Sequence, residues 1–384
     1  PTINLQGKES SRCPDELVER YEAVIRGRRL NWTTHHRLQR LLGSGGQGVV
    51  YLTERRGADG FTLPVAVKIF SPAHYEDASQ YDEAMARIAR VAALVAQIQQ
   101  DNLIDVHDFV DPARIRMMLM EWVDGYDLRR LMVPSMLSDV EHRVSVKRWE
   151  YINRVIVTDG PIQPRIKPGV AVRILRDCLV ALAGPVQAAG DPCVVARAAR
   201  HQGGIVHGGI KRANIMLKRT GTAKIIDIGS AFEISAPPPQ RTCTPSYAAP
   251  EVLEGCETTP SSDLASLGYV LIELLSGRPP FAGLTNLKDL LEAKRFIGQR
   301  LSNILPEDVT RNELLMHLVR GLIAPDPQRR FPTAQDADLD EQGAAAFHRQ
   351  LVKGDLAAEY DNEIRLWLEE LHDLDQADEP TESA

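Results

Sequence analysis

Several features of common protein classes are missing from this sequence. Its cysteines lie far apart, and neither a C-x-x-C pair nor clustered histidines provide the spacing of a zinc site. No stretch approaches the roughly 20 apolar residues that a membrane helix needs, and residues 1–8 lack a signal-peptide pattern. The net charge of −7 argues against nucleic acid or an anionic membrane as the main partner. We therefore expect a cytoplasmic protein, with free thiols at Cys13, Cys178, Cys193, Cys243 and Cys256.

The composition itself is that of an ordinary folded chain. Hydrophobic residues make up 43% and charged residues 25% of the 384 residues, which allows a large core. This length suits either two domains of average size or one large two-lobed domain. Composition does not distinguish these two organisations, but the order of motifs along the chain does.

The first third of the chain alternates between helix and strand patterns. Residues 15–27 place apolar side chains at helical spacing behind an acidic start, which predicts a short helix before the main domain. Between residues 36 and 70, apolar runs broken by glycine-rich turns predict an antiparallel sheet. The alanine-rich stretch 76–99 predicts a long helix, and strand patterns return at 103–110 and 114–123.

The patterns beyond residue 127 are mainly helical. The polar stretch 134–168 has no clear long helix of its own, and we interpret it as an insertion. Residues 170–189 predict an apolar helix that Gly190-Asp191-Pro192 breaks, and Pro185 and Pro192 should block a continuous helix in this region.

Two further stretches complete the organisation of the chain. Residues 184–200 contain Pro192 as well as Pro185 and look like a second insertion. Helical patterns resume at 260–340, and the acidic tail from Asp373 is expected to be disordered because it is poor in apolar residues.

The first motif with chemical meaning is a glycine-rich run. The run Gly43-Ser44-Gly45-Gly46-Gln47-Gly48-Val49-Val50 fits G-x-G-x-x-G-x-V, and glycines let backbone amides approach phosphates closely. Such runs also mark ordinary hairpins. A strand pattern, Val49–Glu54, follows instead of a helix, which favours a hairpin over nucleotide phosphates rather than a Rossmann turn. Lys68 then ends an apolar strand 20 residues after Gly48, where its charge must face solvent, a cleft or a partner.

Later segments carry a family resemblance. Residues 205–217 read IVHGGIKRANIML and residues 224–229 read KIIDIG. In order and spacing they resemble the catalytic loop H-R-D-L-K-x-x-N and the D-F-G motif of protein kinases. The segment 247–251 is similar to the A-P-E motif, 263–268 to the start of the helix that follows it, and 326–330 to the late D-P-x-x-R. The stretch before A-P-E is similar to serine/threonine kinases of bacterial style.

The resemblance covers about residues 36–337 and implies the bilobal protein-kinase fold. This is an α+β fold with a small antiparallel β lobe that carries one helix, and a larger, mainly helical lobe. The expected division is an N-terminal helical extension (1–35), the small lobe (36–123), the large lobe (124–337) with its insertion at about 134–168, a C-terminal helical extension (338–372) and the acidic tail (373–384).

The resemblance also implies a site for ATP and Mg²⁺, with Mn²⁺ as an alternative ion. Lys68 would grip the α- and β-phosphates, Asn214 and Asp227 would hold the metal, and Lys211 would lie near the γ-phosphate. Met120 matches the gatekeeper, backbone groups of Glu121 and Val123 would bond the adenine edge, and Val50, Ala66 and Leu217 would sandwich the ring. The residues implied to bind the nucleotide are Gly43, Ser44, Gly45, Gly46, Gln47, Gly48, Val50, Ala66, Lys68, Met120, Glu121, Val123 and Leu217. Glu251 and Arg330 match an ion pair that braces the large lobe.

Three positions depart from the kinase pattern. Gly209 stands where the catalytic aspartate belongs, so no side chain is present to accept the proton of the substrate hydroxyl. General-base catalysis typically supplies about 10²–10⁴-fold in rate. Gly208 replaces the arginine that contacts a phosphorylated activation loop, which argues against regulation of that kind. The helix glutamate that pairs with Lys68 would be Glu83, the one acid well inside the helix, although the usual position falls near Val91. Less favoured substitutes are Glu76, Asp77 and Asp82.

These departures leave two functions from different classes open. One is a protein kinase that binds Mg-ATP and transfers phosphate slowly to an unidentified protein. The other, which the missing base favours, is a pseudokinase that presents a surface to a protein partner. A small-molecule kinase would explain the phosphate machinery but not the segment that resembles A-P-E.

Overall fold

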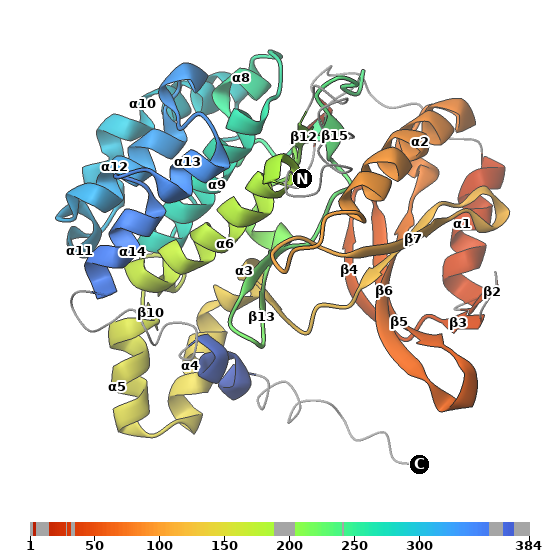
Figure 1. Cartoon of the computed structure of the whole chain (residues 1–384), viewed down its shortest axis with the longest axis horizontal. Coiled ribbons are helices and arrows are strands. Elements are labelled where there is room, and N and C mark those ends of the chain that lie inside the picture. Colours follow the sequence, from red (N-terminus) through yellow and green to blue (C-terminus); the bar gives the residue numbers. More distant parts are fainter. Residues whose placement is uncertain are drawn as a thin grey trace.

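Two lobes of different composition make up the chain, one rich in strands and one mainly helical (Figure 1). The strand-rich lobe lies at the right of Figure 1 and the helical lobe at the left. The predicted bilobal α+β arrangement is confirmed. The computed structural model describes residues 3–4, 15–27, 29–31, 35–187, 204–239, 242–352 and 364–371.

A five-stranded antiparallel sheet forms the small lobe, in the order β4-β5-β6-β8-β7. Its central strand is buried along residues 65–70, as expected for an apolar run with neighbours on both sides. Its β-branched valines and isoleucine suit such a strand. The strands are β4 (Arg40–Gly45), β5 (Gly48–Arg56), β6 (Thr62–Phe70), β7 (Val106–Val110) and β8 (Met117–Glu121).

The helix of the small lobe, α2 (Ala78–Val95), packs its apolar face against this sheet. It begins two residues later than 76 because the Asp77 carboxylate caps it, accepting a hydrogen bond from Gln80 N at 2.8 Å. The buried Tyr81 hydroxyl ties the helix to β6 and to the residue just before β8, since it donates to Phe70 O and accepts from Arg116 N. Other elements on this side are α1 (Asp15–Gly27), β2 (Arg29–Asn31) and β3 (His35–Arg37).

Backbone hydrogen bonds join the two lobes directly. Ile104 N donates to Ile225 O at 2.9 Å, and Ile225 N donates to Asn102 O at 2.9 Å. These bonds run from the segment before β7 to β14 in the large lobe. The large-lobe strands of this region are β9 (Gly125–Asp127), β13 (Ile215–Lys218) and β14 (Ala223–Ile225), in the order β14-β13-β9.

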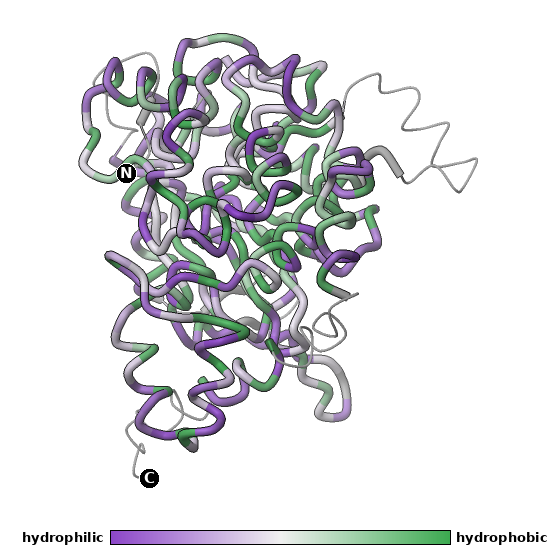
Figure 2. Tube along the Cα trace, turned by 90° about the vertical axis from the view of Figure 1, so that its left-hand side faces the viewer, coloured by the Kyte–Doolittle hydropathy of each residue, from purple (hydrophilic) through white to green (hydrophobic). Residues whose placement is uncertain are grey.

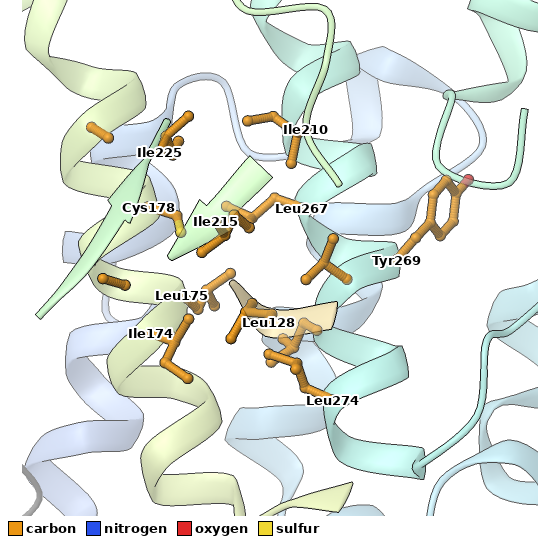
Figure 3. Packing of buried hydrophobic residues seen from close by; sticks show 14 of the residues in the cluster. Leu128, Ile174, Leu175, Cys178, Ile210, Ile215, Ile225, Leu267, Tyr269 and Leu274 are labelled. Carbon is orange, nitrogen blue, oxygen red and sulfur yellow. The ribbon is translucent and has the colours of Figure 1, made fainter. Parts of the chain in front are cut away.

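The large-lobe core forms between α6 (Pro168–Gln187), α9 (Pro260–Ser276) and the strands β13 and β14. Figure 3 shows side chains from α6, such as Leu175 and Cys178, beside Ile215 of β13 and Leu267 of α9. Thr259 and Ser262 cap the start of α9 with reciprocal hydrogen bonds, and Gly277 ends it at a φ of 67°. The helix α9 is therefore fixed at both ends within the core.

The remaining elements surround this core. Figure 2 shows hydrophobic stretches inside the lobe and hydrophilic ones along many of its outer turns. Their bounds are α3 (Leu128–Leu131), α8 (Pro250–Leu253), α10 (Leu287–Ile304), α11 (Glu307–Thr310), α12 (Glu313–Ile323), α13 (Ala334–Leu339), α14 (Ala344–Val352), β1 (Ile3–Asn4), β12 (Ile205–Val206), β15 (Phe232–Glu233) and β16 (Thr242–Cys243).

The stretch 134–168 has more structure than its sequence indicated. It contains two helices of ten residues, α4 (Pro134–Arg143) and α5 (Val146–Val155), followed by the strands β10 (Val157–Thr158) and β11 (Arg165–Ile166). Pro134 occupies the first turn of α4, and Ser145 caps α5 by accepting from Arg148 N. Short amphipathic helices of this kind give a weak signal in a polar stretch.

Helix α6 continues to Gln187, past Pro185, which was expected to interrupt it. A proline at 185 leaves the carbonyl of Ala181 without its helical N–H donor. The side chain of Gln100 donates from Nε2 to this oxygen at 3.1 Å and so replaces the missing bond. The rest of the presumed second insertion, residues 188–200, lies outside the described residues, as does the acidic tail.

A short helical segment at residues 364–371 contacts α5. Ile364, Trp367 and Leu368 are buried, and Glu370 forms an ion pair with Arg148 of α5 at 2.8 Å. Within the described ranges, each helix is too short or too polar to span a membrane.

Candidate active site

A cleft of about 890 Å³ lies between the sheet of the small lobe and the strands and loops of the large lobe. Most of the residues predicted from sequence line it, from five separate stretches of the chain. Those lining residues are Gly43, Ser44, Gly45, Gly46, Gln47, Gly48, Val50, Ala66, Lys68, Met120, Glu121, Val123, Gly209, Lys211, Asn214 and Asp227.

The glycine-rich run forms the hairpin between β4 and β5, with Gly45 opposite Gly48. Gly48 has a φ of 137°, and a β-carbon there would lie 2.0 Å from Ile69 O, so only glycine fits. A β-carbon at Gly43, Gly45 or Gly46 would meet nothing within 4 Å. Packing within the chain therefore does not require these three glycines, whereas close approach of a ligand to the backbone would.

The apolar wall of the cleft comes from paired strands. Ala66 of β6 lies opposite Met120 of β8, and both side chains are almost fully buried. Where β8 ends, the Glu121 carboxylate accepts from Asp105 N at 2.8 Å and forms an ion pair with the buried Lys224. These contacts fix the segment that connects the lobes.

The predicted floor residue Leu217 does not reach the cleft. In β13, Leu217 is fully buried in the large-lobe core, and the neighbouring Met216 lines the cleft instead. Side chains alternate along a strand, so an error of one residue reverses the face. The sequence prediction was wrong by this one position.

Lys68 and Asp227 form an ion pair at the centre of the cleft. Lys68 Nζ lies 2.7 Å from Asp227 Oδ1 and 2.8 Å from Gln47 Oε1, and its side chain is 7% exposed. Asp227 Oδ1 also accepts from Gly229 N at 2.9 Å. Burial by itself raises the pKa of Asp227, but the Lys68 ammonium and the Gly229 N–H outweigh it and lower this pKa to about 2. Asp227 is therefore ionised at neutral pH.

The structure does not bring Glu83 to Lys68. Glu83 lies on the exposed side of α2, outside the cleft. The face of α2 that packs on the sheet is apolar and includes Met85, Ile88 and Val91. The expected pairing of Glu83 with Lys68 is thus not made, because helical periodicity places residue 83 on the wrong face.

The loop that carries Gly209 is held by Asp263 of α9. Its Oδ2 accepts from His207 N at 2.7 Å and its Oδ1 accepts from Gly208 N at 2.9 Å. Burial raises the pKa of Asp263 to about 7, against the effect of these two N–H groups. Gly209 N donates to His207 Nδ1 at 3.2 Å, and burial lowers the pKa of that imidazole to about 4. The loop backbone is thus fixed although residues 208 and 209 have no side chains.

Asn214 completes the polar end of the cleft. Its Nδ2 donates to Gly209 O at 2.8 Å, which orients the amide so that Oδ1 is the group left for a ligand. Within the described part of the chain, histidine, cysteine and acidic side chains form no cluster of three that would hold a metal alone. The amide and carboxylate oxygens of Asn214 and Asp227 are nevertheless the hard donors that Mg²⁺ prefers when phosphates and water supply the rest.

Beneath the cleft, Glu251 of α8 and Arg330 form a buried, two-pronged ion pair. Both Arg330 Nη1 to Glu251 Oε1 and Nη2 to Oε2 measure 2.7 Å. Burial raises the pKa of Glu251, but Arg330 outweighs this effect and the pKa is lowered. The structure thus contains the expected contact between these two residues.

A second polar network was missed by the sequence analysis. Glu273 of α9 is buried, lies 2.7 Å from Arg212 Nη1, and accepts from the Tyr247 hydroxyl at 2.6 Å. Gln163, in the loop between β10 and β11, accepts from Arg212 and donates to Glu273. The partners are far apart in sequence and match no short motif, so only the buried glutamate in an apolar helix gave a signal.

Among the other cleft residues that sequence reasoning missed are Leu42, Met216 and Ser230. Leu42 directly precedes the glycine-rich run and Ser230 directly follows Gly229, so their neighbours could have indicated them.

The comparisons with known proteins agree with this geometry. The protein kinase domain family matches residues 194–338, which include the loop of Gly209, Asp227 and the Glu251–Arg330 pair. The chain has the protein-kinase fold. Its curated relatives include the serine/threonine-protein kinase PrkC of Bacillus subtilis, 27% identical over 312 residues that cover 79% of this chain and 40% of PrkC.

Other relatives of this kinase-fold chain are also bacterial. The serine/threonine-protein kinase PkaA of Streptomyces coelicolor is 28% identical over 80% of this chain and 58% of PkaA. PknB of Mycolicibacterium smegmatis is 28% identical over 85% of this chain and 43% of PknB. The chain therefore spans about half the length of the curated relatives it matches.

Proposed function

We propose that the chain binds Mg-ATP in this cleft and transfers the γ-phosphate to serine or threonine of a protein only slowly or not at all. One observation carries the proposal. Lys68 Nζ and Asp227 Oδ1 lie 2.7 Å apart in a cleft that Asn214 also lines, while residue 209 has no carboxylate. The groups for nucleotide and metal are together, and the group for proton transfer is absent.

Nucleotide binding is supported by the two ends of the cleft. Val50, Ala66, Met120 and Met216 provide an apolar slot that suits a flat ring. At the other end, glycines 43, 45 and 46 leave space above the backbone for phosphates, and Lys68 and Lys211 supply positive charge. ATP has both a flat ring for the apolar slot and phosphates for the charged end.

The metal part of the proposal depends on Asn214 and Asp227. The two residues would supply one amide and one carboxylate oxygen to Mg²⁺ or Mn²⁺. When bound, the ion would neutralise charge on the β- and γ-phosphates. Asp227 suits this role because its lowered pKa keeps it ionised, and Lys68 is positioned beside it for the same phosphates.

Phosphate transfer should be slow because Gly209 replaces the base. Proton acceptance by that carboxylate typically supplies about 10²–10⁴-fold. The backbone of the loop is nevertheless held by Asp263, and Lys211 remains in the cleft. Positioning and charge account for most of phosphoryl transfer, so a residual rate is compatible with this site.

A non-catalytic scaffold is the second candidate function. The position of Glu83 favours it, because Lys68 has no acidic partner from α2 and pairs with Asp227 instead. In that case the nucleotide would stabilise the arrangement of the lobes, and a protein partner would bind the loaded form. The cytoplasm is the proposed location for either function, because ATP is available there.

Two measurements test these functions, and the second separates them. Mg-ATP should raise the melting temperature under both, so an unchanged melting temperature would contradict nucleotide binding. Transfer of radiolabelled phosphate from ATP to the chain itself or to a mixture of proteins, with Mg²⁺ or Mn²⁺, should be slow but detectable for the kinase. No incorporation above that of Asp227→Asn would favour the scaffold.

A further inference from the structure

Gln47, at the tip of the glycine-rich hairpin, connects the two lobes across the cleft. Its Oε1 accepts from Lys68 Nζ at 2.8 Å, and its Nε2 donates to Ser230 Oγ at 3.2 Å. Its own backbone is fixed as well, because Ser71 N donates to Gln47 O at 3.0 Å. Lys68 belongs to the small lobe and Ser230 to the large lobe, so one amide side chain joins both.

The contact is tightly packed over the backbone of Gly229. A β-carbon on Gly229 would lie 2.2 Å from Gln47 Oε1 and 2.6 Å from Lys68 Nζ. Gln47, Lys68 and Asp227 therefore fill the space above this glycine. Within the described residues, Gln47 is the one side chain of the hairpin with a hydrogen bond to the large lobe.

The amide oxygen of Gln47 takes up one of the hydrogen-bond donors of Lys68. An ammonium has three donors, and two of them already point to Asp227 Oδ1 and Gln47 Oε1. If Lys68 grips the nucleotide phosphates, the Gln47 oxygen and a phosphate oxygen compete for the same group.

We propose that Gln47 and Ser230 form a latch that holds the glycine-rich hairpin closed on the large lobe and opposes the binding of nucleotide phosphates. This inference rests on the proposed binding of Mg-ATP. Breaking the latch removes a competitor of the phosphates without removing any group that the adenine contacts. The latch should therefore lower the affinity for ATP and leave the affinity for adenosine unchanged.

The two sides of the latch predict effects of different size. Gln47→Ala removes the bonds to both Lys68 and Ser230, and the affinity for Mg-ATP should increase by about 10-fold. Ser230→Ala removes only the weaker, neutral bond, and the affinity should increase by about 3-fold. The double variant should bind no more tightly than Gln47→Ala, because both substitutions act on one contact.

Titration calorimetry of the full chain with Mg-ATP and, separately, with adenosine tests this inference. Gln39→Ala is the matched control, since Gln39 is an exposed glutamine just before β4 and outside the cleft. It should leave both affinities unchanged. An unchanged or weaker affinity of Gln47→Ala for Mg-ATP would overturn the latch, and so would an equal gain for adenosine.

Hydrogen exchange at residues 43–48 tests the latch without any nucleotide. Exchange of these amides should be faster in Gln47→Ala and Ser230→Ala than in the parent chain and in Gln39→Ala. Equal exchange rates would refute the latch. If the parent chain bound neither Mg-ATP nor adenosine, the proposed function would fail, and the exchange rates would still decide whether the latch exists.

Discussion

A β-carbon on Gly209 would lie 3.3 Å from the β-carbon of Ser230. It would also lie 3.5 Å from Ser230 Oγ and 3.6 Å from Asn214 Nδ2, which are close but adjustable side-chain contacts. Gly208 differs, because its φ is 65° and a β-carbon would lie 2.9 Å from the backbone oxygen of Ser230. A side chain can therefore be introduced at 209 at little cost, whereas one at 208 would be strained.

Gly209→Asp should raise phosphate transfer by about 10²-fold or more. The groups for nucleotide, metal and charge line one cleft, so proton acceptance and orientation of the hydroxyl are the missing contributions. The measurement is transfer of radiolabelled phosphate to the chain itself and to a peptide mixture at saturating Mg-ATP.

The matched control for this variant is Gly209→Asn, which has the same size but no basic carboxylate. It should gain much less than Gly209→Asp. Equal gains would mean that orientation rather than proton acceptance was missing. If Gly209→Asp binds Mg-ATP but transfers phosphate as slowly as the parent, the defect lies instead at Lys68, to which α2 supplies no acidic partner.

Mg-ATP should raise the free energy of unfolding by roughly 2.7 kcal/mol at a concentration a hundred times the Kd. Lys68→Met removes the ammonium from the phosphates, and a Kd at least 10-fold weaker would reduce this gain to about 1.4 kcal/mol or less. The measurement is the melting temperature of each variant with and without Mg-ATP. Because each variant serves as its own reference, a loss of basal stability does not affect the comparison.

Glu83→Gln tests whether Glu83 pairs with Lys68, as the sequence predicted and the structure does not show. Glu83 is exposed and outside the cleft, so this substitution should leave the Mg-ATP shift as it is. A reduced shift would show that Glu83 does act on Lys68, and the pairing seen in the structure would then be incomplete.

The sequence predicted best what depends on local pattern. The strands around Gly48 and Lys68 follow from β-branched runs and turn glycines, and the cleft follows because the sheet pairs these two strands, with Val50 opposite Lys68. The motif resemblance added Asn214 and Asp227 from the other lobe. These are cases in which spacing along the chain and position in space agree.

The errors arose where one residue or one distant partner decides the outcome. Leu217 was predicted to line the cleft where Met216 does, because neighbouring residues of a strand face opposite sides and a shift of one residue reverses the prediction. Pro185 did not end α6, since Gln100, far away in sequence, bonds the carbonyl that proline leaves free. No pattern within the helix carries that information.

As pH falls, His207 should lower the stability of the chain, against an opposite contribution from the neighbouring Asp263, whose pKa is raised to about 7 by burial. Burial lowers the pKa of His207 to about 4, from an ordinary value of 6.5, and the nearby Asp227 carboxylate only partly opposes this change. Between these values the unfolded chain binds a proton that the folded chain does not, so stability is present above pH 6.5 and is lost as pH falls toward 4. The steepest contribution of one group is about 1.4 kcal/mol per pH unit.

Urea unfolding at several pH values between 5 and 7 measures this contribution. His207→Gln should lose less stability than the parent as pH falls through that range, whereas His317→Gln, at an exposed histidine, should behave as the parent does. If the parent and His207→Gln lose stability equally as pH falls, the histidine is not held neutral by burial.

Breaking the Glu251–Arg330 pair should destabilise the large lobe without affecting the nucleotide cleft. The Arg330 side chain is fully buried, so Arg330→Met leaves the Glu251 carboxylate buried without its partner, at a cost of about 3–5 kcal/mol. Replacing both residues by apolar ones, in Glu251→Leu with Arg330→Met, removes the unpaired charge and should recover much of that loss. Urea unfolding of the three chains measures these differences.

The Mg-ATP shift in melting temperature should persist in every variant that folds, because neither residue lines the cleft. A double variant as unstable as Arg330→Met would show that other bonds of the guanidinium, such as those to Ala324 O and Ser261 O, hold the lobe instead.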